Sequence, residues 1–230
     1  MKYFGEGLSE KHKELNSIIR KSAYIDQAKE LFLDLHSYLH ASSISSSQRN
    51  EYDELLDGLK DNEYFIMPTS KDETIAWALW HIARIEDITM NILVNEKDQV
   101  FNQYWKQLMN SNITDTGNAL SDEEIIDFSN KLNISTLLEY RAAVGQRTRD
   151  IIKSLSNNDI KRKISQHSLN KIFEEGGVTA HKDSIWLLDF WGKKDVAGIL
   201  LMPPTRHVML HLNDCCKWKV FIQTRNKFYL

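Results

Sequence analysis

Residues 74–94 read TIAWALWHIARIEDITMNILV, and the spacing of their apolar residues is that of a long helix. Side chains three or four positions apart lie on one face of a helix. One such face carries Thr74, Trp77, Ala78, His81, Ile85, Ile88 and Ile92. His81 falls in the middle of this apolar face, where both of its ring nitrogens need partners. The histidine is therefore either a core residue bonded to a buried carbonyl or hydroxyl, such as that of Thr74, or a ligand.

Three more segments have the same helical period, and period-2 alternation is rare. The four predicted long helices span about 24–40, 70–94, 135–155 and 203–223. The second is expected to begin at Ser70, because SKDE at 70–73 has the pattern of a capping box. Shorter helices are predicted at 10–20, 50–59, 98–109 and 122–131, the last after a second box, SDEE. Together these elements predict an all-α four-helix bundle, with residues 1–230 as one domain.

The links between the predicted helices are long. About 40 residues separate the second long helix from the third, whereas up-down-up-down bundles use short loops. A long link can cross the bundle and join parallel neighbours, so we expect at least one crossover connection. Residues 158–202 include the apolar stretch SIWLLDFWGKKDVAGILL and are expected to pack as short helices over one end of the bundle.

The composition is that of a soluble globular chain. Of its 230 residues, 42% are hydrophobic and 27% are charged, and the formal net charge is -3. This charge gives no basic surface for nucleic acid, and no stretch approaches the roughly 18 apolar residues of a membrane span. The two cysteines, Cys215 and Cys216, are adjacent, so a disulfide framework is not expected. We expect a cytoplasmic protein with neither a nucleic-acid nor a membrane partner.

A histidine pair in the last predicted helix supplies a partner for His81. Residues 205–214 read TRHVMLHLND, which places His207 and His211 one turn apart on one face. Two histidines alone make a poor metal site. With His81 they give three imidazoles on the inner surfaces of two helices, and three imidazoles plus an open position are the ligand set of a catalytic-type metal site.

A second pair has the same spacing. LHSYLH in the first predicted helix contains His36 and His40, which flank the apolar stripe beside a serine-rich loop. We interpret them as a partly exposed helix end, where histidine favourably faces the C-terminal end of the helix dipole. Pocket lining and metal ligation are the alternatives. The remaining histidines, His12, His167 and His181, are expected to face solvent.

Several residues lie within two turns of the proposed ligands. Asp214, one turn after His211, is either a solvated carboxylate or a group that orients a ligand imidazole or a bound water. Trp77 and Trp218 are expected to wall the site or to fill the core. Cys215 is either an alternative ligand or, as we expect, a buried and inert thiol. Val208 occupies the position that a glutamate has in H-E-x-x-H, so the general base of the familiar zinc proteases is missing there.

The sequence resembles the DinB-like superfamily of metal-dependent enzymes, in which a histidine of the second helix and an H-x-x-x-H of the last helix hold a divalent metal. WALWHIARIED, at 77–87, is similar to the second-helix motif and puts His81 in the single-histidine position. LLMPPTRHVMLHLND is similar to the last-helix motif and puts His207 and His211 in the paired positions. Many members continue there with Arg-Gly-Gln, whereas this chain has Leu212-Asn213-Asp214, and longer links make it an extended member.

The resemblance implies one divalent transition metal, zinc or nickel, and favours a thiol-dependent transferase. We therefore expect a metal-dependent S-transferase in which a metal-bound thiolate attacks an electrophile. A hydrolase that uses metal-bound hydroxide is the alternative enzyme, and a non-catalytic stress-response or binding module is the alternative of another class. The expected partners are a small thiol and an electrophilic substrate, with a homodimer as the assembled form.

Overall fold

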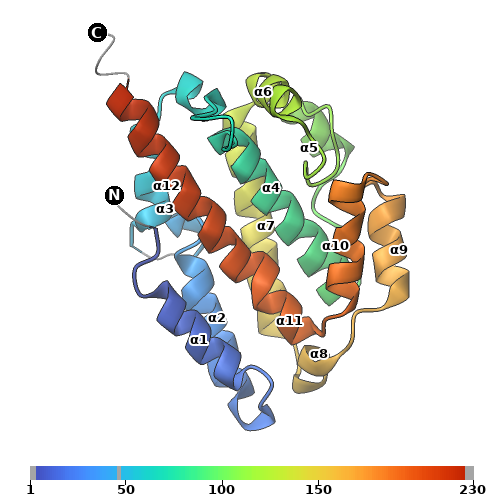
Figure 1. Ribbon diagram of the computed structural model, residues 1–230. Coiled ribbons are helices and arrows are strands. Elements are labelled where there is room, and N and C mark those ends of the chain that lie inside the picture. The colour runs from blue at the N-terminus through green and yellow to red at the C-terminus, as the bar shows by residue number, and fades with distance from the viewer. Residues whose placement is uncertain (1–3, 46–47, 226–230) are drawn as a thin grey trace.

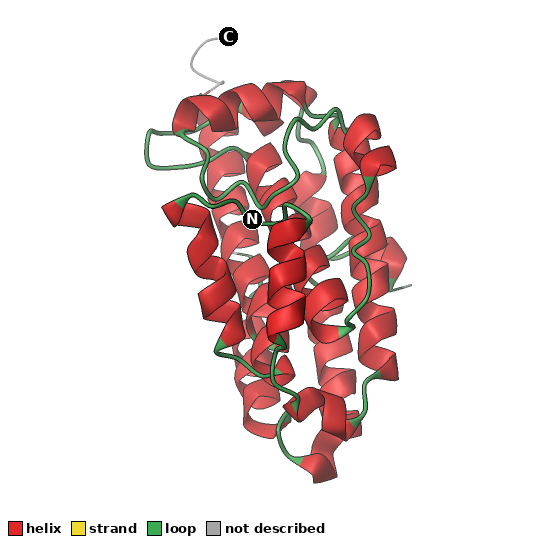
Figure 2. Ribbon diagram, turned by 90° about the vertical axis from the view of Figure 1, so that its right-hand side faces the viewer, coloured by secondary structure: helices red, strands yellow, loops and turns green. Residues whose placement is uncertain are grey.

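The chain folds as a bundle of helices. The computed structural model describes residues 4–45 and 48–225, and no β-strand occurs in those ranges (Figure 2). The long elements are α2 (Ile25–Ser37), α4 (Ile75–Asp87) continued by the π-helical η4 (Ile88–Val94), α7 (Ile134–Ser154), and the π-helical η5 (Met202–His207) continued by α12 (Val208–Arg225) (Figure 1). The predicted all-α fold is confirmed.

Side-chain hydrogen bonds fix the directions of α4 and α7. Arg84 on α4 donates to Tyr140 on α7 at 2.8 Å, and Arg147 donates to Asn91 at 3.2 Å. Because the pairs ascend together along both helices, α4 and α7 are parallel. The link of residues 95–133 must therefore run the length of the bundle, which confirms the expected crossover.

The other neighbouring pairs are antiparallel. His81 meets His207 across α4 and the η5–α12 helix, while Asp72, just before α4, accepts from Trp218 near its far end. α2 and α7 also run in opposite directions, since Arg149 donates to the carbonyl of Leu33 whereas the earlier Arg141 donates to that of Leu39. The resulting order around the bundle is α2, α7, α4 and α12 (Figure 1).

α4 is the central helix. Every residue from Ile75 to Val94 is buried, so the helix is covered on all sides rather than along one stripe. It nevertheless carries charged side chains, and each of these must find its partner within the protein. Within residues 4–45 and 48–225, neither this helix nor any other is both long and apolar enough to cross a bilayer.

Asp87, the last residue of α4, anchors the start of the crossover link. Its carboxylate accepts five hydrogen bonds, from Tyr140 (2.6 Å), Arg84 (3.2 Å), Asn91 (2.8 Å), and the backbone N–H groups of Val100 and Phe101 (both 2.8 Å). The group is fully buried, and an unpaired charge there would be costly. This set of bonds ties α4, α7 and the link together.

The shorter predicted helices are present. α1 (Leu8–Ile18), α3 (Glu51–Leu56), α5 (Gln103–Leu108) and α6 (Asp122–Lys131) correspond to the predictions at 10–20, 50–59, 98–109 and 122–131. The capping box at Ser121 is also confirmed. Short 3-10 turns cover Ser22–Tyr24, Ser42–Ile44 and Asp61–Phe65.

Residues 158–202 form a helical cap beside η4. Its elements are α8 (Asn157–Lys161), α9 (Gln166–Glu174), α10 (Lys182–Gly192) and α11 (Val196–Leu200). Their apolar side chains share a core with η4 and the end of α7, and Trp191 is almost fully buried in it. The expectation of short helices over one end of the bundle is confirmed.

The predicted start of the second long helix was wrong. Ser70 lies in a turn, and α4 begins after Thr74, whose hydroxyl accepts from the backbone N–H of Trp77 at 3.0 Å. The Thr74 hydroxyl also bonds to that of Ser129 on α6 at 2.6 Å. A capping box recognises local chemistry only, and here the buried contact with α6 decides which residue caps the helix.

Removal of the Thr74 hydroxyl should therefore destabilise the chain. Thr74→Val keeps the side-chain volume but removes the acceptor of the Trp77 amide and one of the two hydrogen bonds of the Ser129 hydroxyl, which keeps its bond to the Ile125 carbonyl. We expect a loss of about 1–2 kcal/mol in the free energy of unfolding. Urea denaturation of both variants measures it. Ser70→Ala is the control and should change stability by less than about 0.5 kcal/mol. A larger loss of stability in Ser70→Ala than in Thr74→Val would show that Ser70, not Thr74, caps the helix.

Candidate metal centre

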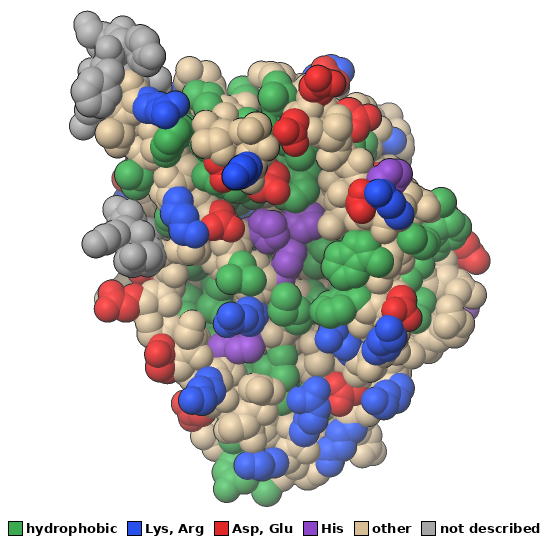
Figure 3. Space-filling view, in the orientation of Figure 1, with side chains coloured by type: hydrophobic (Ala, Val, Ile, Leu, Met, Phe, Trp, Pro, Cys, Tyr) green, Lys and Arg blue, Asp and Glu red, His purple; other side chains and the backbone are tan. Residues whose placement is uncertain are grey.

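The three predicted ligands lie together. His81 is in the middle of α4, His207 ends η5, and His211 is in the first turn of α12. One ring nitrogen from each lies within 4.8 Å of the others, and the ring centroids are 4.6–5.0 Å apart. His81 is buried, whereas His207 and His211 are half-buried. Figure 3 shows a group of histidine side chains at the centre of one face of the molecule.

The tautomer of His81 is set by the crossover link. Its Nδ1 lies 2.7 Å from the backbone oxygen of Thr116, which can only accept, so Nδ1 carries the proton. Nε2 therefore presents its lone pair and lies 3.1 Å from Nε2 of His207. Nitrogen ligands about 2.0–2.1 Å from one ion are separated by about 3 Å, so this spacing fits two ligands of a shared metal.

Four successive backbone carbonyls of the link hold four side chains of α4. The donors and acceptors are Arg84 with Thr114 (3.0 Å), Trp80 with Asp115 (3.0 Å), His81 with Thr116 (2.7 Å), and Trp77 with Gly117 (3.2 Å). We call residues 114–117 the carbonyl run. A carbonyl that accepts from a ligand imidazole fixes the orientation of its ring. The carbonyl run thereby holds the α4 side chains of the site in place.

Trp77 forms one wall of the site, as predicted. Its ring stacks on that of His81 at a centroid distance of 4.6 Å with an interplanar angle of 8°, and meets His211 edge-on at 6.1 Å. Gly117 lies behind it with a positive φ of +76°, and a Cβ atom there would come within 2.7 Å of the Trp77 Nε1. The close approach of link and indole thus requires glycine.

The π-helical turn before α12 follows from its two prolines. Pro203 and Pro204 lack the N–H groups that a regular helix would use, and the hydroxyl of Thr205 satisfies the carbonyl of Leu200 at 2.8 Å. His207 ends this wide turn and His211 follows on the regular helix. π-helical segments of this kind often occur at functional sites.

All three histidines are held in their neutral form. Burial lowers the pKa of His81 to about 3, and the neighbouring His211 adds to the effect. Burial also lowers the pKa of His211 to about 4, and burial with the neighbouring histidines holds that of His207 well below its usual value. Neutral imidazole is the form that binds metal.

The donor set fits a transition metal ion. Among the residues that the structure describes, the buried Nδ1 atoms of His207 and His211 find no hydrogen-bond partner, although buried ring nitrogens are normally satisfied. Nε2 of His207 can share a hydrogen bond with Nε2 of His81, 3.1 Å away, but the cluster keeps unpaired buried ring nitrogens, which is unfavourable in the absence of a ligand. Two half-buried histidines leave one side of the cluster open to solvent.

The remaining predicted residues have other partners. Asp214 is partly exposed and pairs with Lys217 at 2.7 Å rather than with a histidine. Trp218 donates to Asp72 at 3.0 Å. Cys215 is fully buried, and burial raises the pKa of its thiol, which agrees with an inert side chain.

The interpretation of His36 and His40 as an exposed helix end was wrong. Both are buried, and their Nε2 atoms lie 2.9 Å from the two oxygens of Glu86, a buried residue of α4. Arg141 completes this cluster, with Nη1 3.1 Å from Nδ1 of His40. Burial alone would raise the pKa of Glu86, but the two histidines hold it well below its usual value. The signal in the sequence that could have indicated this cluster is Glu86, an acidic residue within the apolar stretch 74–94.

Of the other histidines, His167 and His181 are exposed, as expected, whereas His12 is half-buried and its Nε2 bonds the carbonyl of Leu201 at 2.7 Å. The expectation of solvent exposure was therefore wrong for His12, which joins α1 to the end of α11.

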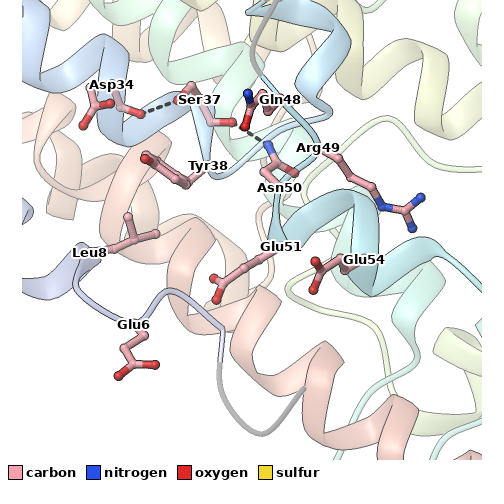
Figure 4. Close-up of a pocket in the computed structure, with 10 residues that line it drawn as sticks. All are labelled: Glu6, Leu8, Asp34, Ser37, Tyr38, Gln48, Arg49, Asn50, Glu51 and Glu54. Carbon is pink, nitrogen blue, oxygen red and sulfur yellow. Dashed lines mark hydrogen bonds between the residues drawn. The ribbon is translucent and has the colours of Figure 1, made fainter.

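A surface pocket elsewhere does not belong to this centre. It has a volume of about 540 Å³ and is lined by Glu6, Leu8, Asp34, Ser37, Tyr38, Gln48, Arg49, Asn50, Glu51 and Glu54 (Figure 4). Two of its carboxylates already have partners, since Asp34 pairs with Lys11 and Glu51 accepts from the backbone of Gly5. The three histidines of the metal centre are not among the lining residues.

Comparisons with known proteins give a family and a solved structure of similar fold. The family model of the DinB superfamily matches residues 46–213, a range that includes all three histidines. A conserved protein from Enterococcus faecalis, known from its crystal structure, is similar in fold, with a TM-score of 0.53 and 15% sequence identity. The similarity covers 86% of this chain and 96% of that one. No curated protein matches the sequence.

The carbonyl run gives a direct test of the support behind His81. Gly117→Ala forces a clash with Trp77 and should displace the Thr116 carbonyl, so we expect metal affinity to fall about 10–100-fold. Cobalt titration against a competing chelator measures it. Gly58→Ala is the matched control, because Gly58 also has a positive φ, +70°, but nothing within 4 Å of an added Cβ. Equal losses in the two variants would show that backbone strain alone is responsible.

The neutral histidines predict acid sensitivity of the metal-free chain. Unfolded histidines take up protons below about pH 6.5, whereas burial keeps the pKa of His81 at about 3. Stability should therefore fall as pH drops below about 6.5, by about 2 kcal/mol at pH 5 for each such histidine. His81→Gln should weaken the pH dependence of the urea midpoint by this amount, and His167→Gln, at an exposed position, should leave it unchanged. Parallel curves for the wild type and His81→Gln would contradict the prediction.

Proposed function

This chain belongs to the DinB superfamily, and from that membership we propose that His81, His207 and His211 bind one divalent transition metal ion, zinc or nickel. The observation that carries the proposal is the convergence of three neutral ring nitrogens from two helices, with one side open to solvent. Thr116 holds the first ligand and Trp77 covers its ring, so the protein supplies a fixed and partly dry set of ligands.

We propose further that the protein is a metal-dependent S-transferase. When bound, the ion would supply a positive charge that lowers the pKa of a coordinated thiol. Three imidazoles do not offset that charge. In the transfer, the sulfur of a small thiol forms a bond to an electrophilic carbon while the bond from that carbon to its leaving group breaks. The leaving group takes the electron pair of that bond, and the thiol proton passes to solvent through the open side.

The residues beside the ligands His207 and His211 favour a thiol over water. Val208, which follows His207, is completely buried and apolar. Asp214, the acidic residue one turn past the last ligand, is engaged by Lys217. Activation of water needs a group that takes its proton near neutral pH, whereas a thiol ionises far more readily.

One carboxyl supports the alternative of a hydrolase. Glu73 lies two turns before His81 and is half-buried; burial and then the charge of Asp214 raise its pKa. A carboxyl with a raised pKa is suited to general acid–base chemistry near neutral pH. Glu73→Gln should abolish hydrolysis of an ester in this alternative and should leave thiol transfer largely intact in the favoured one.

The metal content of histidine variants tests the site. The wild type should bind about one divalent ion per chain, measured by elemental analysis after cobalt or zinc loading. Alanine at His81, His207 or His211 should lower the affinity by at least about 100-fold, since three ligands are reduced to two. His167→Ala, which changes an exposed histidine, should bind as the wild type does. Full retention of metal by all three ligand variants would refute this ligand set.

Thiol binding tests the proposed chemistry. A small thiol such as 2-mercaptoethanol should change the visible spectrum of the cobalt-loaded protein, because a sulfur ligand adds charge-transfer bands near the cobalt transitions. The same protein should couple the thiol to a reactive electrophile at least about 10-fold faster than His207→Ala does. Without a spectral change or a rate difference the transferase is rejected, and a non-catalytic binding module takes its place.

A further inference from the structure

The buried cluster of His36, His40 and Glu86 resembles a second metal site. His36 lies in the last turn of α2 and His40 just past its end, the carboxylate comes from α4, and one potential ligand atom of each lies within 4.8 Å of the others. Two imidazoles and a carboxylate are a common ligand set for transition metals. By residue types and spacing alone, this cluster is as good a candidate as the three-histidine centre.

Arg141 distinguishes the two clusters. Its Nη1 lies 3.1 Å from Nδ1 of His40, and a guanidinium group can only donate, so Nδ1 must present its lone pair. A neutral imidazole has one proton, which then resides on Nε2. That atom lies 2.9 Å from the Glu86 carboxylate and donates to it. His40 therefore has no lone pair left for a metal ion.

The position of the guanidinium is fixed by further contacts. Its Nη2 donates to the carbonyl of Leu39 at 2.8 Å, and the group stacks over the ring of Tyr52 at 4.7 Å. Gly145, one turn further along α7, leaves room for His40, since a Cβ there would come within 2.5 Å of its Nδ1. Arg141 and His40 are thus held in contact rather than brought together by chance.

Charge balance acts in the same direction. Arg141, His40 and Glu86 are each at most 1% exposed, and the guanidinium offsets the single negative charge of the carboxylate. A divalent ion in this cluster would leave two uncompensated positive charges away from water, which is strongly unfavourable. The three-histidine centre differs in both respects, because it is open to solvent and has an acceptor, the Thr116 carbonyl, behind His81.

We propose that Arg141 keeps the His36–His40–Glu86 cluster free of metal and so directs the ion to the three-histidine centre. Without the guanidinium, the same three side chains become a metal site: Nδ1 of His40 can take the proton, Nε2 can bind, and the carboxylate charge attracts a cation.

The test compares cobalt stoichiometry in Arg141→Met with that of the wild type. Elemental analysis after loading with cobalt(II) chloride and removal of excess ion should show one additional equivalent in Arg141→Met, and the further change His40→Gln should remove it. Arg149→Met is the matched control, because Arg149 lies two turns along the same helix and bonds α2 through the Leu33 carbonyl. It should bind as the wild type does. An Arg141→Met variant that folds but gains no ion would overturn the proposal.

A second measurement decides the matter if Arg141→Met does not fold. In His81→Ala/His207→Ala, with Arg141 in place, we expect no bound cobalt at a tenfold excess of ion. One retained equivalent that is lost on adding His40→Gln would overturn the proposal. Although the assignment of the ion to the three-histidine centre rests on the proposed function, the gain on removal of Arg141 does not. It is read as a difference from the wild type, whether that protein binds one ion or none.

Discussion

The candidate site depends on one hydrogen bond, from Nδ1 of His81 to the backbone carbonyl of Thr116. α4 is buried along its whole length, so a polar side chain on it has no access to water and must be satisfied by protein. The crossover link provides the acceptors as consecutive carbonyls. The link can do so only because Asp87 holds its first residues against the helix. The helix, the link and His81 are therefore held together by hydrogen bonds. These bonds fix the proton of His81 on Nδ1 and leave the lone pair of Nε2 facing His207.

The fold was largely predictable because its signals are local. The helical period marks α2, α4, α7 and α12, and the long link before α7 predicts a parallel pair. The exact start of α4 was not predictable from the sequence. Ser70 has the pattern of a cap, but the contact of Thr74 with Ser129 makes Thr74 the capping residue. The burial of α4 on every side was also not predicted. Helical periodicity identifies one apolar face, and the elements that cover the other faces are distant in sequence.

The site was predictable in part. Its three histidines follow from the order and spacing of two motifs, and the structure brings them together. The support behind them could not be read from the sequence, because a backbone carbonyl at Thr116 has no signature in residue type. The pairing of Asp214 with Lys217 likewise depends on rotamers. In the second cluster, the histidine spacing was visible, but the roles of Glu86 and Arg141 required knowledge of which helices are neighbours. Identical H-x-x-x-H spacings thus acquire opposite chemistry from the group behind the ring, an acceptor in one case and a donor in the other.

The carbonyl run also bears on how such a protein can diverge. A main-chain oxygen is present whatever side chain its residue carries, so substitution at Asp115 or Thr116 does not delete the acceptor that orients α4. Gly117 is the exception, because a Cβ at this position would collide with the Trp77 ring. Selection can therefore change the side chains around the three histidines, while the hydrogen bonds that join α4 to the link are kept.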